Sequence, residues 1–205
     1  MPRIGIDGTC LGSGRGYGRF LRELLPPLLA QAGDHEYLLF VDAATAARVA
    51  LPAMPVKLLE TGASQAAAAS ARGARSPRDM LRMGCGVARA QLDAFYFPSV
   101  YSYFPLPPRL PMALAIHDTI PERHGTIVFP RWQNRALWWA KSRAARLQAR
   151  TIVTVSEYAR RQIAETFRMP AERIWVTPEA PSPVFAPVPN ASEAASKALA
   201  ERGIA

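Results

Sequence analysis

The sequence predicts an α/β fold, a three-layer sandwich built on a mainly parallel central sheet. Short apolar runs alternate with longer stretches whose apolar residues recur at helical spacing, the pattern of β-α-β units. A glycine-rich turn follows the first run, where such folds pass from strand to helix. The chain has 205 residues, 49% of them hydrophobic, which suffices for one well-buried domain and is short for two.

The alternation defines the elements in order. Strands are expected at 3–7, 36–41, 56–60, 94–97, 112–117, 151–155 and 173–177, and helices at 16–31, 43–50, 77–92, 129–150, 156–167 and 192–202. Pro26 and Pro27 are expected to kink or loosen the first helix. The segments 61–76 and 101–111 are expected to be loops.

Two helices carry apolar stripes that we expect to face the sheet. In the helix at 77–92 the stripe is Leu81, Cys85, Ala88 and Leu92, with Arg78, Arg82 and Arg89 beside it. In the helix at 129–150 it is Ala136, Leu137, Ala140, Ala144 and Leu147.

The positive charge is concentrated in two places. Lys and Arg number 25 against 16 Asp and Glu, a formal charge of +9. The segment 72–92 holds five basic residues and one acidic, and 131–150 holds six basic and no acidic residue. Since the rest of the chain is balanced, a nucleic-acid-binding protein with charge spread over its surface is not expected.

Several other classes are not expected either. No run approaches the roughly 18 to 20 apolar residues of a membrane span, and the first residues do not resemble a secretion signal. Cys10 and Cys85 have no metal or disulfide spacing, and there are three histidines. A reducing cytoplasm and the absence of a metal cofactor are therefore expected.

The turn at residues 7–19 is the first candidate binding element. A glycine-rich strand-to-helix turn lets backbone N–H groups approach a phosphate at the positive end of a helix. Gly14, Arg15 and Gly16 are the candidates. The turn lacks the G-x-G-x-x-G spacing of dinucleotide sites and the Gly-Lys-Ser/Thr of P-loops, so a turn without a ligand stays an alternative.

His117 and Asp118 follow a strand expected near the middle of the sheet, at the end where α/β sheets bind ligands. An imidazole there can hydrogen-bond a sugar hydroxyl or move a proton, and the carboxylate can orient it or cap the next turn. They are the candidate catalytic residues. A histidine bonded only to backbone is the alternative.

The helix at 129–150 combines tryptophan and arginine on one arc. Trp132, Arg135, Trp139, Arg143 and Arg146 make up this arc. Exposed Trp among Arg is typical of a helix lying in a bilayer interface, so contact with an anionic membrane is one interpretation. Tryptophans covered by a neighbouring loop are the other.

Four segments in this order resemble the N-terminal lobe of a GT-B glycosyltransferase of the GT4 (group 1) family. They are G-S-G-R-G-Y-G-R-F-L-R-E-L-L from residue 12, A-I-H-D-T-I-P from 115, T-V-S-E-Y-A-R-R-Q-I from 154 and R-I-W-V-T-P-E-A-P-S-P-V-F-A-P from 173. The resemblance implies a Rossmann-like acceptor-side domain over residues 1–187. Residues 188–205 would be a linker and helix leading to a C-terminal donor-binding domain that is not in this sequence.

The resemblance implies transfer of a sugar from a nucleotide-sugar donor with retention of configuration, without a metal. Gly14, Arg15 and Gly16 would contact the donor diphosphate, His117 the donor sugar, and Glu157 would support the site or cap its helix. Tyr17, Tyr101 and Tyr103 are the candidates for contact with a glycan or lipid-linked glycan acceptor. Glu179 and Ala180 depart from the Asn and Gly of many members.

The expected role is polysaccharide or glycolipid synthesis at the cytoplasmic face of the membrane, with the 205 residues inactive by themselves. Two alternatives stay open. One is a Rossmann oxidoreductase, in which Asp42 would bind a ribose. The other is a non-enzymatic basic module that binds anionic lipid or nucleic acid.

Overall fold

The fold is an α/β sandwich on a seven-stranded, all-parallel sheet. The computed structural model describes residues 1–14, 16–62, 76–181 and 191–203. The strands are β1 (Arg3–Asp7), β2 (Glu36–Asp42), β3 (Val56–Leu59), β4 (Ala94–Phe97), β5 (Met112–Ala115), β6 (Thr151–Thr154) and β7 (Ile174–Val176). Their order is β3-β2-β1-β4-β5-β6-β7, and each pair is parallel. The predicted fold class is confirmed.

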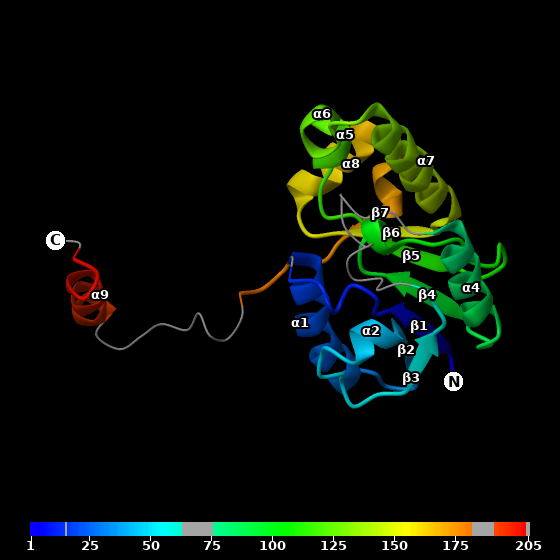
Figure 1. The fold of residues 1–205 in the computed structure, drawn as a ribbon, viewed down its shortest axis with the longest axis horizontal. Helices are drawn as coiled ribbons and strands as arrows, with labels where there is room; N and C mark the ends of the chain where they lie inside the picture. The colour runs from blue at the N-terminus through cyan, green and yellow to red at the C-terminus, as the bar shows by residue number, and fades with distance from the viewer. Residues whose placement is uncertain (15, 63–75, 182–190, 204–205) are drawn as a thin grey trace.

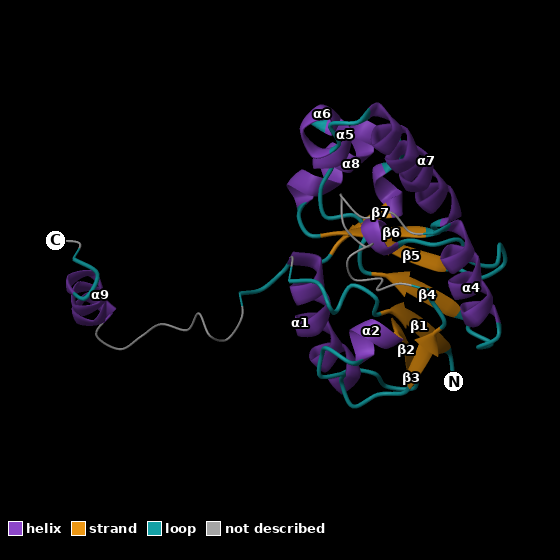
Figure 2. Ribbon diagram, viewed as in Figure 1, coloured by secondary structure: helices purple, strands orange, loops and turns teal. Residues whose placement is uncertain are grey.

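Helices cover both faces of this sheet (Figures 1 and 2). The helices are α1 (Gly16–Ala30), α2 (Ala43–Ala46), α4 (Pro77–Ala88), α5 (Ile120–Arg123), α6 (Gly125–Val128), α7 (Trp132–Gln148), α8 (Glu157–Phe167) and α9 (Ala191–Ala200), with 3-10 turns η1 (Val100–Ser102) and η2 (Ala171–Arg173). The prolines at 26 and 27 lie inside α1, which continues to Ala30. Figure 1 draws α9 apart from the sheet.

Alternation along the strands divides the core in two. Leu39 and Val41 of β2 pack with Leu21 and Leu25 of α1 on one face. The neighbouring residues of β2 face the other way and share a second cluster with Phe95, Phe97 and side chains of α4, α7 and α8. Because successive strand residues point to opposite faces, β2 supplies both clusters.

The two predicted apolar stripes are wrong. On α4 the buried residues are Asp79, Met83, Gly84 and Val87, while Leu81 and Cys85 are exposed. On α7 the buried residues are Trp138, Ser142 and Ala145, and the whole predicted stripe of Ala136, Leu137, Ala140, Ala144 and Leu147 is exposed.

On α7, Trp138 faces inward in place of the predicted stripe because it has a large ring and an indole N–H that can donate a hydrogen bond. Its ring packs between Tyr101 and Phe129, with centroid separations of 4.6 and 5.5 Å. Its Nε1–H donates to Glu122 Oε1 at 2.9 Å. A tryptophan that finds both aromatic neighbours and an acceptor gains more from burial than a row of alanines, so this residue sets which face of α7 turns inward.

The turn before α1 depends on a glycine that the pattern did not single out. Gly18 is buried, and a Cβ there would lie 2.3 Å from Ser13 O and 2.7 Å from Cys10 O. A Cβ on Gly14 would meet no atom of the described structure within 4 Å. Gly18 is therefore required by packing, whereas Gly14 leaves the backbone open to its surroundings.

We expect Gly18→Ala to lower the free energy of unfolding by about 1–3 kcal/mol, because backbone oxygens cannot move away as a flexible side chain can. Urea unfolding measures the change, with Gly14→Ala as the matched control that should stay close to the parent protein. Equal stability of the two variants would contradict the close contact.

Candidate functional site

A cavity of about 1280 Å³ lies at the carboxyl edge of the sheet. The strand order reverses between β1 and β4, and ligands of open α/β sheets bind at such a point. Its walls are the start of α1, residues 99–101 at η1, residues 115–118 after β5, the facing side of α7 and residues 178–181 after β7. Parallel strands bring these distant segments to one edge.

His117 is held in a defined orientation in this cavity. Its Nε2–H donates to Pro98 O at 2.9 Å, since a carbonyl can only accept. Nδ1 lies 3.7 Å from Glu179 Oε1. The Phe20 ring meets the imidazole edge-on at 4.8 Å between centroids. With Nε2 committed to backbone, Nδ1 is the nitrogen left to exchange a hydrogen bond or a proton with a ligand.

Asp118 lines the cavity beside His117 and also shapes the chain after it. Its Oδ1 accepts from Ile120 N at 2.8 Å at the start of α5. This bond turns the backbone so that Pro121 and Glu122 also face the cavity. One carboxylate oxygen thus caps the turn at the start of α5, the second of the two uses predicted for Asp118.

A row of aromatic rings forms one wall. Tyr17 stacks on Tyr101 at 5.7 Å between centroids, and Tyr101 packs on Trp138 at 4.6 Å. Lys141 Nζ donates to Tyr101 O at 2.6 Å and ties this wall to α7. Rigid, mainly apolar walls with a few fixed polar groups are typical of small-molecule sites.

The structure brings together only part of the predicted set. Gly16, Tyr17, Tyr101, His117 and Asp118 line the cavity, and Gly14 and Arg15 do not belong to its described lining. Arg15 lies outside the described residues, as do 63–75 of the predicted loop at 61–76. Gly16 is exposed, and a Cβ on it would meet no described atom within 4 Å, which leaves the start of α1 accessible.

The structure places Tyr103 and Glu157 outside the candidate site, and the position of Glu157 agrees with its alternative as a residue of the helix start. Tyr103 is only 3% exposed, and its hydroxyl donates to Gln148 Oε1 at 3.1 Å. Burial raises the pKa of its phenol. Tyr103 is thus a core residue that an acceptor cannot reach. Glu157 begins α8 outside the cavity lining, 3.4 Å from the guanidinium of Arg160.

Asp42 does not fit the oxidoreductase alternative. It is fully buried, and its two oxygens accept from Thr45 N at 3.1 Å and Thr45 Oγ1 at 2.6 Å, capping α2. A ribose hydroxyl could not reach either oxygen. The polar residue at the end of β2 is therefore a helix cap.

Phe20, Glu122 and Trp138 are lining residues that sequence reasoning missed. Phe20 follows Tyr17 by one helical turn, a spacing that places both on one face. Glu122 comes directly after the predicted His-Asp segment, so its proximity to the site could have been inferred. Nothing local to α7 indicated that Trp138 would turn inward.

The family model of Glycosyltransferase Family 4 matches residues 16–180 of the chain. The chain belongs to this family. The match begins at Gly16, within the glycine turn, and takes in the His-Asp segment and the segment through Ala180, which are parts of the chain that wall the cavity. No curated protein matches the chain in sequence.

Two solved glycosyltransferases share the fold of this family member. One is Anabaena Alr3699/HepE, solved in complex with UDP and glucose, with a TM-score of 0.56 and 14% sequence identity. The similarity covers 99% of this chain and 50% of the HepE chain. The other is Phytolacca americana apo UGT2, with a TM-score of 0.55 and 11% sequence identity. The similarity covers 96% of this chain and 55% of the UGT2 chain. The chain thus spans about half the length of these enzymes.

Within the part of the chain that the structure describes, no three His, Cys, Asp or Glu side chains are grouped to hold a metal ion. The same residues include no helix long and apolar enough to cross a bilayer.

We expect Glu122→Ala to lower the free energy of unfolding by about 1–3 kcal/mol, because Trp138 Nε1–H and Ser142 Oγ–H lose their shared acceptor inside the protein. Glu122→Gln keeps an oxygen at that place and should recover most of the loss. Thermal unfolding measures both, with the exposed Glu172→Ala as control. If Glu122→Ala is as stable as Glu172→Ala, the two hydrogen bonds to Glu122 do not contribute to the stability of the fold.

Proposed function

We propose that the chain is the acceptor-side half of a retaining, nucleotide-sugar-dependent glycosyltransferase of GT4 group 1. Family membership and the GT-B-like sheet support the reaction class. The observation that carries the proposal is the oriented His117 in a large cavity at the carboxyl edge, across from the open start of α1.

In this proposal the start of α1 faces the donor diphosphate. The backbone N–H groups of Gly14, Arg15 and Gly16 stabilise the charge that develops on the departing nucleotide, and the helix dipole adds to their effect. Such preorganised donors need no metal. His117 Nδ1 accepts a hydrogen bond from a hydroxyl of the transferred sugar, and Asp118 keeps the loop in place.

The acceptor binds along the aromatic wall of Tyr17 and Tyr101. Glu179 stands 3.7 Å from His117 Nδ1, where many family members have Asn. It gives this chain an extra carboxylate beside the reacting sugar, with which a hydroxyl-rich acceptor can form hydrogen bonds. The expected product is a cell-surface polysaccharide or glycolipid.

The nucleotide itself belongs to a second Rossmann-like domain that follows residues 188–205. The chain covers 50% and 55% of the two similar enzymes, in keeping with one lobe of two. The isolated chain is accordingly expected to be inactive, and complete sites form only when both lobes face each other.

We place the protein at the cytoplasmic face of the membrane, through α7. Trp132 is 66% and Trp139 63% exposed, so no loop among the described residues covers them. Leu137 and Leu147 are exposed on the same helix, and 131–150 contains no acidic residue. An apolar, acid-free helix surface suits an anionic bilayer.

The arginines of this helix divide between two roles. Arg143 is exposed. Arg135 donates to Phe129 O and Pro130 O at 3.1 and 3.2 Å, and Arg146 is partly buried against the Phe167 ring. The membrane-facing set is therefore Trp132, Trp139 and Arg143, while Arg135 and Arg146 are held by the protein.

We expect His117→Ala to reduce sugar transfer by about 10²-fold, because the transferred sugar loses a fixed hydrogen-bonding partner and its orientation. The assay uses the protein encoded by the full open reading frame. It measures the release of nucleoside diphosphate from each of a panel of nucleotide sugars. His35→Ala, on the loop before β2, is the matched control and should retain full rate. A His117→Ala enzyme as fast as the control would refute the assigned role.

We expect the chain to bind vesicles of phosphatidylglycerol and phosphatidylcholine but not phosphatidylcholine alone. Trp132→Ala with Trp139→Ala should weaken this by about tenfold or more, given roughly 1.5–3 kcal/mol for burying a large apolar side chain. Trp175→Ala, 65% exposed on β7, is the control. Binding is measured by co-sedimentation with the vesicles. If the double variant sediments with them as the parent chain does, α7 is not the membrane-binding element.

A further inference from the structure

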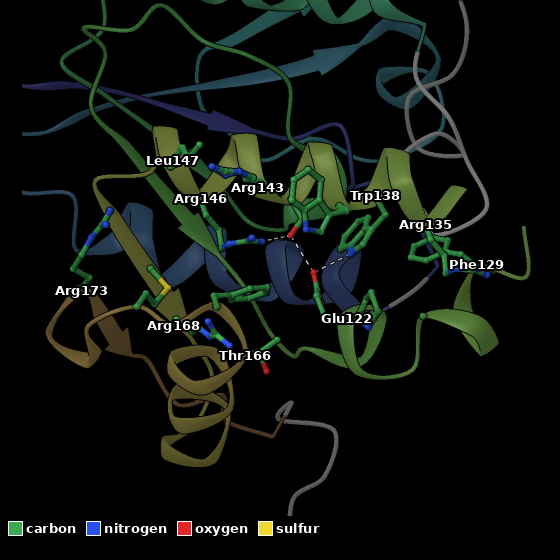
Figure 3. Close-up of a pocket in the computed structure, with 16 residues that line it drawn as sticks. Glu122, Phe129, Arg135, Trp138, Arg143, Arg146, Leu147, Thr166, Arg168 and Arg173 are labelled. Carbon is green, nitrogen blue, oxygen red and sulfur yellow. Dashed lines mark hydrogen bonds between the residues drawn. The ribbon is translucent and has the colours of Figure 1, made fainter. Parts of the chain in front are cut away.

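A second cavity, of about 1030 Å³, lies between α7 and the end of α8 (Figure 3). We call it the arginine groove. It is lined from α7 by Arg135, Trp139, Arg143, Arg146 and Leu147, and from the other side by Phe167, Arg168, Met169 and Arg173. Figure 3 shows Thr166 and Arg168 across from Arg146.

The groove adjoins the cavity that holds His117. Pro121, Glu122, Trp138, Ser142 and Phe167 line both. Glu122 and Trp138 are joined by the 2.9 Å hydrogen bond already described and stand between the two. A ligand bound in the groove therefore lies next to the cavity that holds His117.

The groove is strongly positive. Five arginines line it, against one carboxylate, that of Glu122. Glu122 Oε1 already accepts from Trp138 Nε1 and from Ser142 Oγ at 3.0 Å. Within the described ranges none of the five guanidinium groups forms an ion pair with a carboxylate. The single carboxylate of Glu122 leaves most of this positive charge uncompensated among the described lining residues.

Several of these arginines are already held in position. Arg146 bonds Ser142 Oγ, and its guanidinium carbon lies 3.7 Å from the centroid of the Phe167 ring. Burial lowers its pKa, Glu122 counteracts this and Arg143 adds to it, yet an arginine keeps its charge at neutral pH. Arg173 donates to Ala149 O at 2.7 Å. Fixed guanidinium forks suit phosphate oxygens, because little freedom is lost on binding.

The rest of the lining is apolar. Trp139, Leu147, Phe167 and Met169 alternate with the arginines. Leu147 is 73% exposed and Trp139 belongs to the proposed membrane-facing surface, so the outer end of the groove opens where α7 would meet lipid. A purely ionic ligand would leave this lining uncovered.

We propose that the arginine groove binds the phosphate or diphosphate of an amphiphilic acceptor, whose apolar chain runs outward over α7 toward the membrane. The arginines hold the phosphate, and the end of the molecule that receives the sugar extends past Glu122 and Trp138 to His117. This deepens the proposed function and rests on it for the role of acceptor, while binding itself depends on the groove alone.

The test uses farnesyl diphosphate as the probe, with farnesol and inorganic pyrophosphate as the two partial ligands. Calorimetry on the 205-residue chain should show saturable binding of farnesyl diphosphate, at least about tenfold weaker binding of either partial ligand, and weakening by added salt.

Arg143→Gln combined with Arg168→Gln removes two exposed groove arginines. We expect about tenfold weaker binding or more, from the strength of hydrogen bonds to charged groups. Arg48→Gln combined with Arg89→Gln is the matched control, because it removes the same charge from exposed sites outside the groove lining. Circular dichroism verifies that both variants are folded.

Three results would overturn the proposal: pyrophosphate binding as tightly as the amphiphile, farnesol binding as tightly, or the groove variant binding no worse than the control. Sugar transfer by the protein encoded by the full open reading frame is measured in a separate assay. Transfer to a neutral acceptor without farnesyl diphosphate binding would reject the groove alone. Groove binding without transfer from any nucleotide sugar would reject the proposed function alone.

Discussion

The structure depends on parallel strand pairing. Because all strands run the same way, every strand ends at the same edge, and the chain must cross back to the opposite edge before each new strand. Residues as far apart in the sequence as Tyr17, His117 and Glu179 thus line one cavity. The reversal of strand order between β1 and β4 opens space there, since the following connections leave in opposite directions.

A second constraint is the contact of Glu122 with Trp138 and Ser142. It joins the loop after β5 to α7 and fixes the rotation of that helix. The same rotation turns Trp132, Trp139 and Leu147 outward and brings Arg143 and Arg146 toward the end of α8. One buried cluster thus determines the wall of the cavity, the composition of the groove and the exposed surface of α7.

The sequence predicted the sheet and its element order because strand and helix periodicities are local. The glycine turn and the His-Asp segment could also be predicted, since each depends on a few neighbours in the sequence. The inward faces of α4 and α7 were not, because Met83 and Trp138 are selected by partners distant in sequence. Tyr103 shows the same limit. A tyrosine in a predicted loop was expected to be accessible, whereas its burial and its hydrogen bond to Gln148 show a core residue.

The central claim is that this member of Glycosyltransferase Family 4 binds its ligands at the carboxyl edge of the sheet. Hydrogen–deuterium exchange, with and without each of several nucleotide sugars, tests it in the protein encoded by the full reading frame. The account expects at least one nucleotide sugar to slow exchange at residues 16–21 and 116–120, with no change at 32–35 on the opposite edge. Slowed exchange confined to 32–35 would contradict it.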